Sequence, residues 1–263
     1  MPTGSASTAT LAVVVPVYRP DLSADERLTL RQLEHYLPAA EKHLLMPEGL
    51  SFHRPGYHEA RFAPAFFADL RGYNRLMLDD RLYAHFDRYE YILIHQLDAL
   101  VLSPDIGRFL DLGVDYLGAP WIDYGPDGAP RLARVGNGGL SLRRVSAFRR
   151  LLSSHISARQ YYRHAYEGSS RLVGLLKAGL KGLGVRSAIG RDILDSLGNE
   201  DEFIAERATV YDRGFRIGDL PQALAFAFER EPRFCFAEAG GRLPWGVHAW
   251  EKYDRGFWEP HIV

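Results

Sequence analysis

One carboxylate stands inside the most apolar stretch of this chain of 263 residues. Asp98 lies in the run from Tyr89 to Leu102 (YEYILIHQLDALVL), and Gln96 precedes it by two positions. Such a run predicts a strand covered on both faces, where an ionised carboxylate is costly unless a positive group meets it. Asp98 is therefore either a neutralised core acid or a site residue at the strand end. We favour the site, because ligands of open α/β sheets collect at the carboxyl ends of strands.

Two more carboxylates begin a predicted helix. Asn199, Glu200 and Asp201 open the segment NEDEFIAERA, with Asn199 as the candidate N-cap. The helix dipole favours acids in a first turn, so ordinary helix-start chemistry is one explanation of the pair. The other is that one carboxylate faces a pocket and accepts a proton as a general base.

The elements that must position these residues begin with a strand, a helix and a strand. Residues 11–17 (LAVVVPV) predict a buried strand, and Ser23 with Glu26 forms a capping box that opens a helix to about Tyr36. Residues 43–46 predict the second strand. This order makes a parallel crossover the default arrangement.

The rest of the chain continues the alternation of helices and strands. The spacing predicts a long helix over 64–86, a short helix over 104–110, a strand over 115–120, a loop over 123–130, a strand over 136–144 and mostly helix over 145–210. Residues 1–10 are small and polar, which predicts a disordered tail. No linker-like segment follows, so we expect one α/β domain over 11–263 with a helical insert at about 150–195.

Composition excludes several classes of protein. A net charge of -1 provides no field for a nucleic-acid partner. The single Cys235 rules out an intramolecular disulfide and a Cys-rich zinc site, which is typical of the reducing cytoplasm. No segment approaches the roughly 20 apolar residues of a spanning helix, so any membrane contact is expected to be peripheral.

Residues 169–191 (SSRLVGLLKAGLKGLGVRSAIGR) combine leucines with Lys and Arg and contain no acid. A basic amphipathic segment of this kind can lie on the anionic inner face of a membrane, close to a lipid-linked acceptor. It can equally be a helix that packs across an acceptor cleft with its cations in water. Its five glycines disfavour a stable helix.

The order of these elements resembles the GT-A class of nucleotide-sugar glycosyltransferases. More narrowly, the stretches VVVPVYR, YNRLML, YILIHQLDA, GAPW, GNGGLSLRR, NED and HAW resemble a bacterial and fungal family of unknown function regarded as GT-A-like, over about residues 11–258. The resemblance implies a single Rossmann-like domain with a mixed, mostly parallel central sheet flanked by helices. It also implies transfer of a sugar from a nucleoside diphosphate sugar to a hydroxyl of a glycan or lipid-linked saccharide, as in polysaccharide biosynthesis.

The resemblance further implies a divalent metal, Mn or Mg, which neutralises the departing diphosphate. GT-A enzymes usually carry Asp-x-Asp, whereas this chain has Gln96-Leu97-Asp98, so Asp98 matches the second acid and an amide replaces the first. His248, between Trp245 and Trp250, matches a late metal-binding histidine. A turn-capping Asp98 and a hydrogen-bonded structural His248 are the plainer alternatives.

The catalytic base implied by the resemblance is the Asp of an x-Glu-Asp motif. That motif places the base at Asp201, with Glu200 as the second candidate. A base opposite the leaving group inverts the anomeric configuration, and a retaining mechanism is the alternative.

The resemblance also implies where the donor binds. Tyr18 is expected to stack on the base, Arg19 to pair with phosphate or ribose, and Glu48 to accept from a ribose hydroxyl. A solvent-exposed turn for Glu48, a solvated helix face for Asn74 and Arg75, and a hairpin turn at Asn137-Gly138 are the alternatives. The full set of expected donor-binding residues is Pro16, Tyr18, Arg19, Glu48, Asn74, Arg75, Gln96, Asp98, Asn137, Gly138 and Gly139.

A different class of function competes with transfer. Gln96 in place of an acid favours a GT-A-like domain that has lost its metal site and binds a nucleotide sugar or a partner. A metal-dependent phosphoester hydrolase has less support, because no acid or His cluster stands out. The sequence specifies neither the sugar, the base, the acceptor nor an oligomeric state.

Overall fold

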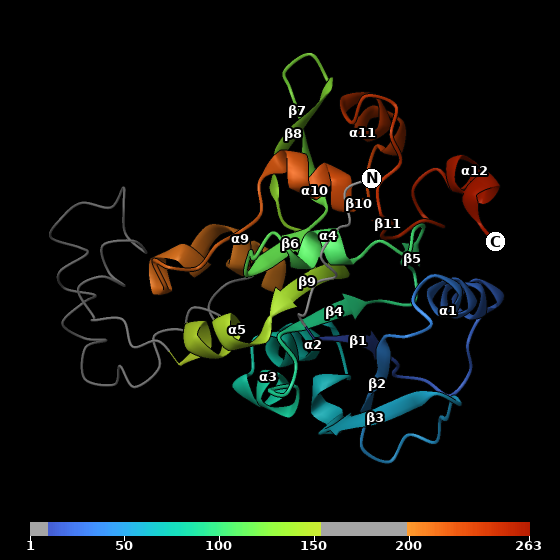
Figure 1. Ribbon diagram of the computed structural model, residues 1–263, viewed down its shortest axis with the longest axis vertical. Coiled ribbons are helices and arrows are strands. Elements are labelled where there is room, and N and C mark those ends of the chain that lie inside the picture. The colour runs from blue at the N-terminus through green and yellow to red at the C-terminus, as the bar shows by residue number, and fades with distance from the viewer. Residues whose placement is uncertain (1–9, 154–198) are drawn as a thin grey trace, which may run out of the picture.

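The computed structural model describes residues 10–153 and 199–263 (Figure 1). Its central sheet has six strands in the order β3-β2-β1-β4-β9-β6. The first four are mutually parallel, and β9 runs antiparallel to both β4 and β6. This confirms the expected α/β fold with a mixed, mostly parallel sheet. The strands are β1 (Leu11–Pro16), β2 (Glu41–Pro47), β3 (Tyr57–Phe62), β4 (Tyr91–His95), β6 (Tyr116–Gly118) and β9 (Leu140–Arg144).

Helices cover both faces of this sheet, as the ribbon in Figure 1 shows. A hydrophobic cluster of buried side chains packs on each face of the sheet. Alternate residues of β4 belong to the two clusters, with Ile92 and Ile94 in one and Tyr91 and Leu93 in the other. An apolar strand buried on both faces is the pattern expected from parallel sheets. One cluster takes in α2 (Leu70–Met77), α3 (Asp80–His85), α5 (Val145–Leu152) and α9 (Glu200–Tyr211), and the other α1 (Ala24–Tyr36), α4 (Gly107–Leu110) and α10 (Leu220–Phe226).

The capping box of α1 forms as predicted. The Ser23 side chain accepts from the Glu26 backbone N–H at 3.1 Å, and the Ser23 N–H donates to the Glu26 carboxylate at 2.7 Å. The parallel pairing of β1 with β2 confirms the expected crossover through this helix.

The prediction of one long helix over 64–86 was wrong. The segment forms a 3-10 turn (Pro64–Phe66) followed by α2 and α3. Asp69 accepts from the Gly72 N–H at 2.7 Å and Asp79 from the Arg81 N–H at 2.9 Å. Each aspartate caps a new helix, and N-capping competes with continuation of the preceding one.

The apolar run is also divided, contrary to the prediction of one strand. β4 ends at His95, and the Ala99 N–H donates to the Gln96 carbonyl at 3.0 Å to make a turn. The chain then joins a second sheet, which contains β5 (Leu100–Val101), β10 (Ala227–Phe228) and β11 (Gly246–Val247). Asp98 therefore lies in the turn just after the central strand, as expected of a site residue at the strand end.

Several boundaries differ from the predicted ones. Strand β3 was not predicted. The predicted strand over 115–120 is divided between β6 and the first residue of β7 (Pro120–Tyr124). β7 pairs with β8 (Pro130–Val135) in a hairpin that includes the predicted loop over 123–130. Strand β9 begins at Leu140 and lies in a different sheet from β8, so Asn137-Gly138 is not a hairpin turn. The chain ends with α11 (Pro232–Glu238), α12 (Arg255–Trp258) and a 3-10 turn (Glu259–His261).

The predictions for the tail, the insert and the basic segment at 169–191 fall wholly or mostly outside the described residues. Of the predicted helical region, α5 and α9 are the described parts. Within 10–153 and 199–263, no helix has the length and apolar character needed to cross a bilayer.

Candidate functional site

A pocket of about 600 Å³ opens at the carboxyl ends of β1 and β4. This edge is where parallel sheets of α/β proteins bind ligands. The end of β1, the start of α2 and the turn after β4 contribute most of its walls. The lining residues are Pro16, Tyr18, Arg19, Glu26, Phe67, Ala68, Asp69, Leu70, Tyr73, Gln96, Leu97, Asp98 and Glu251.

His248 meets Asp98 beside this pocket. Its Nε2 lies 3.3 Å from Oδ1 of Asp98 and 3.2 Å from Oε1 of Gln96, and its Nδ1 lies 3.1 Å from Oε1 of Glu229. The burial of His248 opposes its charge, but the hydrogen bonds to Asp98 and Glu229 raise the pKa of the imidazole to about 10. Although burial acts to raise the pKa of Asp98, the contact with His248 outweighs it and lowers the pKa below its usual value.

The backbone holds these residues in place. The Gln96 N–H donates to the Gly139 carbonyl at 2.9 Å, and the Trp250 N–H donates to the Asp98 carbonyl at 3.3 Å. A Cβ on Gly139 would lie 2.0 Å from Nε2 of His248, so the imidazole fills the space above this glycine. The turn after β4, the glycine loop and the segment after β11 therefore converge on one point.

The donor atoms at this point fit a divalent cation. Two ligands of an octahedral ion, each about 2.1 Å from it, lie about 3 Å apart. The 3.2 and 3.3 Å separations at His248 Nε2 are close to that spacing. Among the described residues no group of three His, Cys, Asp or Glu can hold a metal, so the site offers Asp98, His248 and the Gln96 amide, and further ligands must come from donor phosphates or water.

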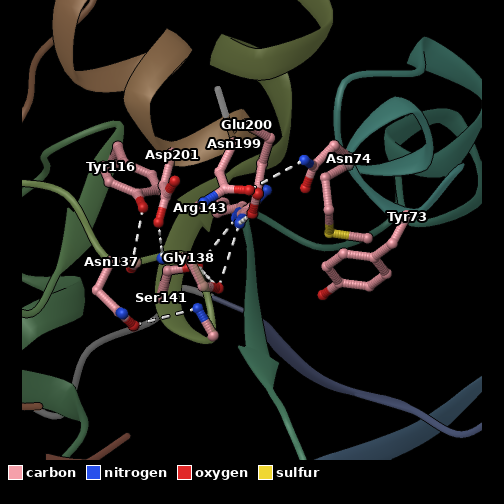
Figure 2. A network of polar contacts seen from close by, with 12 residues as sticks. Tyr73, Asn74, Tyr116, Asn137, Gly138, Ser141, Arg143, Asn199, Glu200 and Asp201 are labelled. Atoms are coloured by element: carbon pink, nitrogen blue, oxygen red, sulfur yellow. Dashed lines mark hydrogen bonds and ion pairs between the residues drawn. The ribbon is translucent and has the colours of Figure 1, made fainter. Parts of the chain in front are cut away.

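Asn137, Gly138 and Gly139 form a tight loop between His248 and α9. The Asn137 side chain accepts from the Gly139 N–H at 3.2 Å, and the Gly138 N–H donates to Oδ2 of Asp201 at 3.0 Å. Figure 2 shows Asp201 pointing from the start of α9 to Gly138. This loop is the physical link between Asp201 and the Asp98–His248 pair.

Glu200 and Asp201 have different surroundings. Glu200 is buried and pairs at 3.0 Å with Arg143, a fully buried side chain that also donates to the Gly138 carbonyl (Figure 2). Arg143 donates to the Tyr83 hydroxyl as well. Both side chains of this ion pair lie in the protein interior. Burial and the neighbouring charge of Glu200 raise the pKa of Asp201 to about 6, while the Gly138 N–H opposes the shift. Of the two carboxylates, Asp201 is the one suited to accept a proton near neutral pH.

The structure brings most of the sequence-predicted residues together. Pro16, Tyr18, Arg19, Gln96 and Asp98 line the pocket. His248 adjoins them, and the glycine loop connects His248 to the start of α9. The predicted residues of these two segments are Asn137, Gly138, Gly139, Glu200 and Asp201.

Three donor-binding predictions fit neither the pocket nor the glycine loop beside His248. Glu48 is exposed in the turn after β2, and its N–H donates to the Phe62 carbonyl. Arg75 is exposed on α2, two residues and so about 200° around the helix from Tyr73, which faces the pocket instead. Asn74 donates to the Asn199 side chain at 3.3 Å and thereby joins α2 to the start of α9. Trp245 and Trp250 are fully buried in hydrophobic clusters and do not line the pocket.

Sequence reasoning missed five residues at the site. Glu26 was recognised only as a capping residue and Tyr73 only as part of an apolar helix face. Asp69, Glu229 and Glu251 carried no signal of their own, although Glu251 lies three residues after His248. Their roles depend on contacts between segments far apart in the chain.

The fold is that of the GT-A glycosyltransferases. One solved structure, a glycosyltransferase involved in the glycosylation of the major capsid of PBCV-1, is similar at a TM-score of 0.50 and 12% identity, over 96% of this chain and 98% of that one. The galactosyltransferase LgtC, solved with donor and acceptor sugar analogs, gives a TM-score of 0.46 at 14% identity, over 90% and 86%.

The family itself is shown by sequence. Residues 57–248 match the model of the family described as "Protein of unknown function (DUF5672)", and the chain belongs to that family. No curated protein matches the sequence.

Proposed function

We propose that this protein is a glycosyltransferase that moves a sugar from a nucleoside diphosphate sugar to an acceptor hydroxyl, with inversion and with the help of a divalent cation. The observation that carries the proposal is the meeting of Asp98 and His248 at the edge of a GT-A sheet, with Asp201 joined to them through the Gly138–Gly139 loop. The similarity of the fold to a glycosyltransferase structure is independent support.

The outer part of the pocket suits a nucleoside. Tyr18 and Leu70 line it with 57% and 64% of their surfaces exposed, so both offer apolar area to a flat base. Arg19 is held at 2.5 Å by Glu26, which is itself fixed by the capping box of α1. This places one guanidinium at the pocket for a phosphate or ribose oxygen.

The charges of the pocket call for a cation with the donor. Glu26, Asp69, Asp98 and Glu251 line it together with Arg19, the one Lys or Arg of its lining among the described residues. A diphosphate in these surroundings is repelled unless positive charge accompanies it. Asp98, His248 and the Gln96 amide are the residues that would hold Mn or Mg there, and the bound ion would supply charge stabilisation to the departing diphosphate.

Asp201 takes the role of general base. Its Oδ2 is oriented by the Gly138 N–H, and its raised pKa matches the task of accepting the acceptor hydroxyl proton near neutral pH. As the acceptor oxygen forms its bond to the anomeric carbon and the bond to the diphosphate breaks, the hydroxyl proton passes to the Asp201 carboxylate. Attack from the face opposite the leaving group inverts the anomeric centre.

The acceptor is a glycan or lipid-linked saccharide in this proposal, and the protein works in the cytoplasm. Contact of residues 169–191 with the inner face of a membrane is part of the same hypothesis. Vesicle flotation of the full chain with anionic and neutral lipids tests it, because only anionic vesicles should retain the protein.

Transfer is tested with the purified full chain, Mn or Mg, and a panel of nucleoside diphosphate sugars. Proton NMR follows donor hydrolysis or transfer and reads the anomeric configuration of the first product. We expect turnover by the wild type, and loss of it in Asp98→Asn and Asp201→Asn. Full activity in both variants would refute the assigned roles, and a retained configuration would refute inversion.

A nucleotide-sugar-binding protein without turnover is the second candidate. The direct contact of His248 with Asp98, and the amide at position 96, favour it, because the imidazolium can neutralise the carboxylate by itself. Calorimetry separates the two functions. Binding that is indifferent to Mn, with no product on long incubation, would favour the binding protein.

A further inference from the structure

We infer that Glu229 is a positioning residue that directs Nε2 of His248 at the cation site and returns to the site the negative charge that Gln96 lacks. The inference rests on the proposed function. The Glu229–His248 contact lies outside the pocket, on the far side of the imidazole from Asp98.

Glu229 and His248 are neighbours by strand register. β10 and β11 are parallel, with Phe228 paired to Val247, so Glu229 and His248 are the next residues along each strand. The His248 N–H donates to the Phe228 carbonyl at 2.9 Å and continues the pairing. Both side chains are largely buried, with 15% of Glu229 and 12% of His248 exposed. The backbone therefore fixes this contact.

The contact determines which ring nitrogen of His248 points toward the cation site. Nδ1 lies 3.1 Å from the Glu229 carboxylate, which can only accept a hydrogen bond. A ring that donates from Nδ1 presents Nε2 to Asp98 and Gln96, which is the orientation that a metal-binding histidine needs. A carboxylate behind such a histidine also makes the ring a stronger ligand.

The amide of Gln96 is oriented for the same purpose. Its Nε2 donates to the Tyr73 hydroxyl at 3.2 Å, which leaves its Oε1 facing Nε2 of His248. Gln96 therefore offers an oxygen without charge. Within residues 10–153 and 199–263, Asp98 is the one acid that contacts His248 Nε2, and Glu229 supplies a second negative charge from the other side of the ring.

A purely structural role for Glu229 is the rival explanation, since the contact also joins β10 to β11. The two roles predict different measurements. A structural residue changes the free energy of unfolding and leaves the affinity of the folded protein for a cation unchanged. A positioning residue changes that affinity at a temperature where every variant is folded.

The experiment measures Mn²⁺ binding to the full chain by electron paramagnetic resonance of the free ion, with saturating uridine or guanosine diphosphate. Glu229→Gln keeps the shape of the side chain and removes its charge. We expect Mn²⁺ to bind about 10- to 100-fold more weakly, the usual effect of losing such a partner. Glu238→Gln, on an exposed position of α11, is the matched control and should bind Mn²⁺ as the wild type does. Circular dichroism confirms that each variant is folded.

A second variant tests the charge directly. In the double variant Glu229→Gln with Gln96→Glu, the negative charge removed at position 229 is replaced by one at position 96, beside Nε2 of His248. Glutamate has nearly the same shape as the glutamine that it replaces. We expect the double variant to bind Mn²⁺ at least tenfold more tightly than Glu229→Gln does. No regain would overturn the charge part of the inference.

The outcomes also separate this inference from the proposed function. Equal Mn²⁺ affinity of wild type and Glu229→Gln would overturn the role of Glu229 and leave the proposed transferase standing. Failure of the wild type to bind Mn²⁺ with either nucleotide would overturn the cation assignment and the inference with it.

Discussion

Gly139 shows at the scale of one residue why the glycine loop belongs to the site. A methyl group there would lie 2.0 Å from Nε2, and 2.5 and 2.6 Å from two ring carbons, of His248. Gly139→Ala must therefore displace the imidazole from Asp98. We expect at least a tenfold loss of Mn²⁺ affinity and a similar loss of transfer.

The matched control for this substitution is Gly107→Ala on α4, where a Cβ meets no atom within 4 Å. It should leave Mn²⁺ binding unchanged. Wild-type Mn²⁺ affinity in Gly139→Ala would show that the position of His248 does not matter for the cation.

Asp201 gives a prediction about pH. A base must be ionised, so kcat should rise as the pH increases through about 6, the value to which burial and Glu200 raise the Asp201 pKa. Asp201→Asn should lower kcat by about 10²- to 10⁴-fold. A stopped assay over pH 5 to 8 measures both effects.

Glu200 provides the control for that pH profile. Glu200→Gln removes the neighbouring negative charge, so the acid limb should move to lower pH in the folded variant. An acid limb that stays in place in Glu200→Gln, or survives in Asp201→Asn, would assign the base to another group.

Single residues also show what the sequence can predict about a site. Asp98 was predictable because an acid in an apolar run needs an explanation, and His248 because a motif order pointed to it. Glu229 was not predictable, because its meaning comes from the register of β10 and β11 and not from its own neighbours in sequence. Glu48 and Arg75 do not line the pocket for the converse reason, since the turn after β2 and the helical position on α2 direct them away from it.

At the scale of elements, the start of α1 links stability to the pocket. Ser23 caps the helix and fixes Glu26, which in turn holds Arg19 at the pocket. Ser23→Ala should lower the free energy of unfolding by about 1 kcal/mol, the usual cost of losing an N-cap. It should also weaken nucleotide binding, because the Glu26 carboxylate that holds Arg19 keeps the Ser23 backbone N–H but loses its hydrogen bond to the Ser23 side chain.

Urea denaturation measures the first effect and calorimetry with a nucleoside diphosphate the second. Ser51→Ala, in the exposed loop after β2, is the control and should change neither. An unchanged free energy of unfolding in Ser23→Ala would contradict the capping role.

The elements differ in how far the sequence determined them. α1 and β1 were predicted because a capping box and a β-branched run are local signals. The division of 64–86 into α2 and α3 was missed because Asp69 and Asp79 can sit inside a helical pattern or cap a new helix, and tertiary packing decides which. β3 was missed because its exposed edge position gives a weak pattern, and its pairing with β2 supplies the hydrogen bonds.

At the scale of the whole molecule, buried histidines make stability depend on pH. Burial lowers the pKa of both His43 and His95 to about 4, from an ordinary value of 6.5. Between those values the unfolded chain binds protons that the folded chain does not, so each histidine removes stability as the pH falls.

The variant His43→Gln removes the contribution of one of these two histidines to the pH dependence of stability. The free energy of unfolding of the wild type, relative to the variant, should fall by up to about 1.4 kcal/mol per pH unit as the pH decreases from 6.5 to 4. Urea denaturation at a series of pH values measures the difference. A difference independent of pH would show that His43 titrates in the folded protein as it does in the unfolded chain.

The fold as a whole was predictable because its order of strands and helices leaves few topologies, and the six-stranded sheet follows that order. The pocket was not, because it is built where β1, α2 and the segment after β11 meet across more than two hundred residues of chain. Only the folded molecule brings Glu251 beside Asp98 and Arg19.

The most direct test of a cation-assisted donor site at Asp98 is calorimetric titration of the full chain with uridine and guanosine diphosphates, with and without Mn²⁺, for wild type and Asp98→Asn. We predict that one nucleotide binds the wild type at least tenfold more tightly with Mn²⁺, and that Asp98→Asn abolishes this gain. Equal affinity with and without Mn²⁺, or a gain that survives in Asp98→Asn, would contradict the assignment of a cation-assisted donor site.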